Sequence, residues 1–128
     1  MKIDFAHYGE KRDVNASDGE LAIFNIVKSF LIEAGAASNS VVLFRRSDSY
    51  VTIKCRVEIA RVKYTERARW ISFQIADSLR DKYVESDLFS AQKNKGQLFW
   101  KSSLSDVSDL VSDPAYREII VAAYKEGF

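Results

Sequence analysis

Apolar residues recur with a helical period in the first well-patterned segment of the chain. Between residues 17 and 34 they return every three to four positions, as in a helix with one broad buried face. The stretch Ser17-Asp18-Gly19-Glu20 has the spacing of a capping box, in which a serine hydroxyl and a glutamate carboxylate accept hydrogen bonds from free backbone N–H groups. We therefore expect a helix that begins here, runs to about Ala34 and ends at Gly35.

In the middle of the chain the period becomes two, which is typical of strands with one covered face. The predicted strands are residues 41–46, 50–55, about 58–64, 69–74 and 97–102. The alternation slips around the third of these, because Val57 and Ile59 keep one phase whereas Val62 and Tyr64 take the other. A regular strand cannot change faces without a bulge or a turn, so we expect a break near residues 56–58.

The remaining segments complete the predicted architecture. Residues 76–83 and the segment after Asp113-Pro114 have helical patterns, and a proline is well tolerated at the first helical position. Residues 90–96, rich in Gln, Asn and Lys, are predicted to form an exposed mobile loop. Residues 1–16 have no clear period and are predicted to be an irregular arm before a single domain at 17–128. We expect an α+β fold with an N-terminal helix, an antiparallel β-meander of four to five strands, and C-terminal helices packed on one sheet face.

The composition is that of an ordinary globular chain. Its 128 residues are 47% hydrophobic and 29% charged with a net charge of +1, so the total charge indicates no particular partner. Cys55 is the single cysteine, which precludes an intramolecular disulfide and favours a reducing, cytoplasmic location. Apolar runs are far shorter than the roughly 20 residues that span a bilayer, and the N-terminus lacks an apolar signal segment, so no membrane association is expected.

Residues that carry catalysis, metal binding or cofactor binding are sparse. The only histidine is His7, which lies in the predicted arm, and Cys55 occupies an inward strand position typical of a small core residue. The five glycines are scattered, so the sequence contains no phosphate-binding glycine loop. We therefore predict no catalytic residue, no metal site and no cofactor, and a non-enzymatic function is favoured.

A metal-dependent hydrolase that uses only carboxylates is the least favoured alternative. It would need Asp and Glu residues with a lysine at the ends of adjacent strands. The candidates in the central sheet are Asp48, Lys54, Glu58 and Lys63, but no acidic residue lies two positions before a lysine on one strand. A turn at Asp48 and a solvated face at Glu58 account for both acids without catalysis.

Basic residues concentrate in the centre of the chain. Residues 41–70 contain eight basic and three acidic residues, a balance of +5, whereas residues 102–128 contain two basic and five acidic residues, a balance of −3. With a period of two, Arg61 and Lys63 leave one face of their strand while Val62 and Tyr64 leave the other. We expect one sheet face to be covered by helices and the other to present cations to solvent.

The favoured function is a binding module that holds nucleic acid, or another anionic partner such as an acidic protein, on this basic face and on the loop at 65–68. Each phosphate that a cation neutralises releases a counterion, and exposed aromatic rings add base stacking. The main candidate residues are Arg61, Lys63, Tyr64, Arg67, Arg69 and Trp70. The secondary candidates are Arg45, Arg46, Lys54 and Arg56.

Two other interpretations stay open at this point. Antiparallel sheets commonly have a solvated face, on which lysine and arginine discourage edge pairing and bind no partner. The second functional alternative is a small regulator or inhibitor that docks on a protein target, with Asp106, Asp109 and Asp113 complementing a basic partner. The sequence predicts no oligomeric state, and it does not fix whether Trp70 and Trp100 are exposed.

Overall fold

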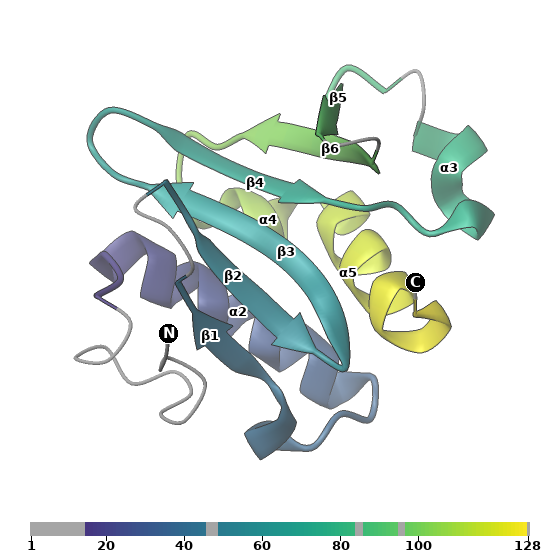
Figure 1. Ribbon diagram of the computed structural model, residues 1–128, viewed down its shortest axis with the longest axis horizontal. Helices are drawn as coiled ribbons and strands as arrows, with labels where there is room; N and C mark the ends of the chain where they lie inside the picture. Colours follow the sequence, from purple (N-terminus) through teal and green to yellow (C-terminus); the bar gives the residue numbers. More distant parts are fainter. Residues whose placement is uncertain (1–14, 46–48, 84–85, 95–96, 128) are drawn as a thin grey trace.

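The described chain folds into one antiparallel sheet with helices against one of its faces (Figure 1). The computed structural model describes residues 15–45, 49–83, 86–94 and 97–127, with the backbone alone at 92–94 and 97–98. The helices are α2 (Asp18–Glu33), α3 (Asp77–Tyr83), α4 (Asp109–Ser112) and α5 (Pro114–Glu126), with a 3₁₀ turn, η2, at Ser38–Ser40. The strands are β1 (Val42–Phe44), β2 (Val51–Cys55), β3 (Val57–Tyr64), β4 (Arg69–Phe73), β5 (Ser90–Asn94) and β6 (Gln97–Ser103). The predicted α+β class, with an N-terminal helix and C-terminal helices on the sheet, is confirmed.

The sheet has the strand order β1-β2-β3-β4-β6-β5, and each neighbouring pair is antiparallel. The first four strands form the predicted meander, and α3 then leads to the hairpin β5–β6, whose second strand lies beside β4. The described sheet has six strands, where four to five were expected, because residues 90–94 pair with β6. The prediction of a mobile loop there was wrong. Its Gln, Asn and Lys residues have low strand propensity, so tertiary pairing, not composition, makes this edge strand.

Both long helices have the ends that the sequence predicted. In α2, the Ser17 backbone N–H donates to Glu20 Oε1 over 2.9 Å, and the Glu20 backbone N–H donates to Ser17 Oγ over 3.0 Å. These two bonds form the capping box, and Gly35 follows the helix with a left-handed φ of 113°. Asp113 caps α5, whose first residue is Pro114. The local signals at helix ends were therefore sufficient to place both helices.

The core lies between the helices and the sheet face that they cover. Side chains with at most 1% exposure include Ile23, Val27 and Leu31 from α2, Ile119, Ile120 and Ala123 from α5, and Val51, Ile53, Ala60, Val62 and Ile71 from the strands. Each such side chain contributes roughly 1.5–3 kcal/mol on burial if it is the size of valine or leucine, so this layer fixes which sheet face is covered. Cys55 is buried in the same core. None of the described helices is long and apolar enough to cross a membrane.

Strand β3 contains a bulge that explains the slip in its alternation. The pairing with β2 shifts after Ile53, which faces Ala60, so Ile59 becomes an extra residue. Ile59 and Ala60 are each 1% exposed, which means that consecutive side chains both enter the core. The break expected near residues 56–58 is a tight turn at Arg56, whose φ is 67°, and the bulge that follows completes the change of phase.

Several residues singled out in the sequence lie outside the described ranges. The predicted arm at 1–16 is described only from Asn15 onwards, so His7 is outside, as are Arg46 and Asp48. The predictions made for these residues therefore stay predictions.

Candidate functional site

Strand pairing aligns side chains in rows on the sheet face opposite the helices, which we call the outer face (Figure 1). One row consists of Thr52, Arg61, Ser72, Lys101 and Ser90. The neighbouring row contains Lys63, Trp70 and Ser103, and Tyr50 extends it because the next residue, Val51, pairs with Val62. The two rows are about 7 Å apart, since side chains on one face of a strand are two residues apart.

Arg61 lies at the centre of the outer face between two aromatic rings. Its guanidinium carbon is 4.3 Å from the centroid of the Phe99 ring and 5.1 Å from that of the Tyr50 ring. Its Nε donates to Glu58 Oε2 over 2.7 Å, and the arginine side chain is only 19% exposed. A guanidinium that is stacked and paired in this way holds the rings in place and offers little charge to a ligand.

Trp70 is flanked by two lysines. Lys101 Nζ lies 4.7 Å from the centroid of the Trp70 ring, and Lys63 faces Trp70 directly across β3 and β4. Lys63 Nζ donates to the Ser49 carbonyl over 2.9 Å, and the Tyr50 and Trp70 ring centroids are 6.0 Å apart. Neither lysine forms an ion pair with an acid of the described residues, so their charges are not neutralised there.

The other main candidates do not join this group. Tyr64 lies on the helix side of the sheet, with its ring against Gly19 in the first turn of α2. The Arg69 guanidinium covers the Tyr64 ring at 4.7 Å and donates to the carbonyls of Thr65 and Ser105. Arg67 is exposed in the β3–β4 turn. The structure therefore brings Arg61, Lys63 and Trp70 together, and it places Tyr64, Arg67 and Arg69 elsewhere.

The described secondary candidates are also dispersed. Arg45 donates to Glu20 Oε1 over 3.4 Å, next to the capping box of α2. The Arg56 guanidinium lies 4.7 Å from the centroid of the Tyr124 ring and donates to the Tyr124 carbonyl, on the helix side. Lys54 is on the outer face, in the position opposite Glu58. The basic residues of the central segment thus divide between the two sides of the sheet.

Sequence reasoning missed two members of the outer face, Phe99 and Lys101. The strand predicted at 97–102 contains Trp100, whose exposure the sequence left open and which is buried at 3% exposure. Period two then sends Phe99 and Lys101 to the opposite face, so this signal was present in the sequence. The sequence did not indicate which strand lies next to this one. β6 pairs with β4, but α3 and β5 separate the two strands in the chain.

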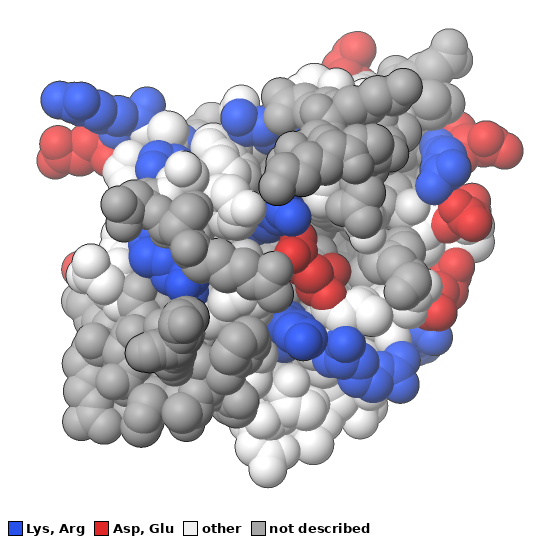
Figure 2. Space-filling view, viewed as in Figure 1, with Lys and Arg blue, Asp and Glu red and all other residues white. Residues whose placement is uncertain are grey.

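Figure 2 looks onto the outer face, with the helices behind the sheet as in Figure 1. Lysine and arginine side chains form a broken band across this face, and acidic side chains interrupt the band near its middle. Further acidic side chains gather at the right edge of the view. Among the described residues in this view, basic side chains therefore extend across the sheet, and acidic ones are concentrated beside it.

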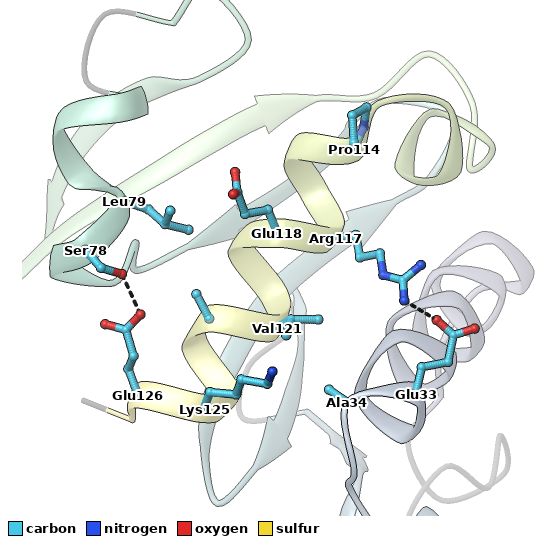
Figure 3. Close-up of a pocket in the computed structure, with 11 residues that line it drawn as sticks. Glu33, Ala34, Ser78, Leu79, Pro114, Arg117, Glu118, Val121, Lys125 and Glu126 are labelled. Atoms are coloured by element: carbon cyan, nitrogen blue, oxygen red, sulfur yellow. Dashed lines mark hydrogen bonds and ion pairs between the residues drawn. The ribbon is translucent and has the colours of Figure 1, made fainter.

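A separate cavity of about 520 Å³ lies on the helix side, between the end of α2, α3 and α5 (Figure 3). Leu79 and Val121 contribute apolar surface to its lining. Its rim is charged, but Arg117 is paired with Glu33 over 2.6 Å, and Glu126 accepts a hydrogen bond from the Ser78 hydroxyl. These rim groups are therefore bound within the protein, whereas Lys125 also lines the cavity and has no ion pair among the described residues.

Glu118, which lines the same cavity, accepts hydrogen bonds from Lys82 Nζ over 2.8 Å and from the Tyr83 hydroxyl. The bond from Lys82, followed by that from Tyr83, lowers the pKa of Glu118 below its ordinary value. Burial and the bond to Glu118 raise the pKa of Tyr83 well above that of free tyrosine. This network therefore keeps a carboxylate and a neutral phenol bound to each other. The described residues contain no cluster of three or more side chains suited to hold a metal ion.

The outer face and the cavity have to be interpreted from their own chemistry. No protein-family model, no curated protein and no solved structure matches this chain.

Proposed function

We propose that this protein is a non-enzymatic binding module that holds nucleic acid on the outer face of its sheet. The observation that carries the proposal is the position of Trp70, a partly exposed ring between Lys63 and Lys101, neither of which is ion-paired with a described acid. Cations attract phosphates, and the neutralised phosphates release their counterions. An aromatic ring next to these cations provides a surface on which a base can stack. Nucleic acid alternates these two groups along its length.

An acidic protein would satisfy the lysines but would leave the rings without a matching group. Carboxylates on a protein surface are surrounded by short polar side chains, whereas a phosphate is always followed by a sugar and a planar base. The partly exposed rings of Tyr50 and Trp70 lie beside Lys63 and Lys101 on the outer face, whereas Phe99 is buried beneath Arg61. This interleaving of rings and cations favours nucleic acid over other anionic partners.

The cavity of Figure 3 supports a second candidate function, docking on a protein target. Its lining includes the apolar side chains of Leu79 and Val121 among charged ones, and Val111 on the nearby α4 is 64% exposed. Apolar surface of this kind is typical of protein interaction sites. A contact made there would depend little on salt, in contrast to phosphate binding. For both candidates we propose a cytoplasmic location, supported by the buried, unpaired Cys55.

The test compares two double variants that remove the same charge from opposite sides of the sheet. In one, Lys63→Gln and Lys101→Gln alter the outer face; in the matched control, Lys28→Gln and Lys125→Gln alter α2 and α5. Fluorescence anisotropy with labelled single-stranded and duplex oligonucleotides gives the association constant over a range of salt concentrations. Each phosphate contact contributes about −0.7 to the slope of log affinity against log salt for a single strand, and about −0.9 for a duplex.

We expect micromolar to submillimolar binding at physiological salt, the range of non-specific contacts, and tighter binding at low salt. The outer-face variant is expected to make the slope shallower by about 1.4, because two phosphate contacts of about 0.7 each are lost. The control variant is expected to keep the slope of the native protein. Equal losses in both variants would show that only overall charge matters, and no binding at low salt would refute the function.

A further inference from the structure

We infer that the nucleic acid on the outer face is single-stranded, with one unpaired base stacked on the exposed side of Trp70. This inference rests on the proposed function and adds the form of the ligand. It depends on two features of the outer face, its width and the placement of its rings.

The outer face is too wide to enter the major groove of a duplex. The five strands from β2 to β5 extend about 19 Å across, at about 4.8 Å per strand, whereas the major groove is about 12 Å wide and admits a helix or a two-stranded ribbon. Trp70 belongs to β4, which pairs with β3 on one side and β6 on the other. Its ring therefore lies over the middle of the outer face and not at an edge strand. A base inside a duplex is stacked on both of its faces, so neither face is free to stack on such a ring. An unpaired base has a free face that can stack on it.

The contacts of the Trp70 ring are compatible with a stacked base. Tyr50 approaches it at 6.0 Å with the ring planes tilted by 58°, and this arrangement leaves the two rings unstacked. Lys101 Nζ lies 4.7 Å from the Trp70 centroid, but a cation–π contact at a partly exposed site is weaker than the stacking of a base. A base can therefore replace the ammonium on the ring, and Lys101 can then contact the phosphate next to that base.

Arg61 acts in this arrangement as a positioning residue. Its guanidinium contacts the rings of both Tyr50 and Phe99, and the bond to Glu58 fixes its orientation. This contact holds the Tyr50 ring in place beside Trp70 before any ligand binds. Preorganised rings lose less conformational freedom on binding, which favours a single-stranded ligand that has to be ordered itself.

Tryptophan emission provides a direct test, since the protein has two tryptophans in different surroundings. Trp100 is 3% exposed in the core, so quenching by a ligand reports on Trp70. The probes are an oligothymidylate and an oligouridylate about 8 nucleotides long, within the roughly 4–16 nucleotides that OB folds cover when they bind single strands, and a duplex of matched length. We expect both single strands to quench the emission and to bind more tightly than the duplex.

The variant Trp70→Ala is expected to bind the single strands roughly 5- to 150-fold more weakly, which is the loss of one stacked base. Trp70→Phe retains a ring and is expected to keep most of the affinity. Tyr124→Ala removes a partly exposed ring from the helix side and serves as the matched control, expected to leave affinity unchanged. Far-ultraviolet circular dichroism checks that each variant is folded.

The measurements distinguish a failure of the stacked-base inference from a failure of the proposed function. Equal binding of single strand and duplex without a change in Trp70 emission would overturn the stacked base while leaving the proposed function in place. Absence of binding to every oligonucleotide at low salt would overturn both. Polyglutamate that binds as tightly as oligothymidylate would also overturn both, because it would assign the surface to acidic proteins.

Discussion

Replacing Gly19 with alanine is expected to destabilise the protein, although alanine is the better helix former. Gly19 lies in the first turn of α2, and an added Cβ would be 2.0 Å from Tyr64 Cδ1 and 2.7 Å from Tyr64 Cγ. The tyrosine cannot easily withdraw, because the Arg69 guanidinium covers its ring at 4.7 Å. Its backbone is also fixed: the Tyr64 N–H donates to Glu20 Oε2 over 3.0 Å, and its carbonyl accepts from Ser17 Oγ over 2.6 Å.

The expected magnitude follows from two opposing contributions. Inserting a methyl group into a packed contact typically costs about 1–3 kcal/mol, whereas glycine to alanine in a helix interior gains up to about 1 kcal/mol. With the full helix gain, the net loss for Gly19→Ala in the native background is about 0–2 kcal/mol, centred at about 1 kcal/mol. In a Tyr64→Ala background the ring is absent, so the same substitution should be neutral or stabilise by up to about 1 kcal/mol. The coupling between the two sites should therefore be about 1–3 kcal/mol.

Urea unfolding of the four proteins in this cycle, monitored by circular dichroism and by tryptophan emission, measures that coupling. Comparable slopes of unfolding free energy against urea are required for the comparison. If Gly19→Ala stabilises both backgrounds by the same amount, the close approach of the Tyr64 ring does not constrain Gly19. The glycine would then be an ordinary helix residue, and the assignment of Tyr64 to structural packing would lose its main support.

Three further substitutions test other contacts. Glu20→Gln removes a carboxylate that is 3% exposed and caps α2, and urea unfolding should show a loss of about 1–3 kcal/mol; no change would contradict its role. Glu118→Gln should lower stability by less than about 1 kcal/mol at neutral pH, because the bond from Lys82 lowers the pKa of this exposed carboxyl. That contribution is present above the ordinary glutamate pKa and is lost as pH falls through the lowered one, so a difference that persists in acid would contradict it. Ser102→Ala leaves the buried Tyr116 hydroxyl without its 2.6 Å partner, and thermal melting should show a loss of about 1–3 kcal/mol.

Features that depend on local sequence were predicted well. The capping box at Ser17 and the Asp113-Pro114 pair placed both long helices, because helix ends depend on the few side chains beside them. Period two also assigned Arg61 and Lys63 to the face opposite Tyr64, since alternation along a strand follows from backbone geometry alone. These predictions did not require knowledge of which strands are neighbours.

Features that depend on strand neighbours were not predictable in the same way. Arg69 was grouped with Arg61 and Lys63, but the β3–β4 turn pairs it with Tyr64, so it shares the helix side with that residue. A shift of one residue in this turn would have reversed its face, and sequence patterns rarely fix a turn length to that accuracy. Lys101 reaches Trp70 only because β6 pairs with β4, which the chain order does not reveal.

The division of basic residues between the two sides follows their side-chain chemistry. Arg45, Arg56, Arg61 and Arg69 each contact a carbonyl, a carboxylate or an aromatic ring of the protein, as expected for a planar group that stacks and forms several hydrogen bonds. Lysine is a compact, strongly hydrated charge on a flexible stem, and the outer-face lysines beside Trp70 make fewer such contacts. A surface that must accept variable phosphate positions is better served by lysines, while arginines fix the rings between them. For this reason we expect the lysine variants to weaken the proposed nucleic-acid binding without disturbing the sheet on which the rings depend.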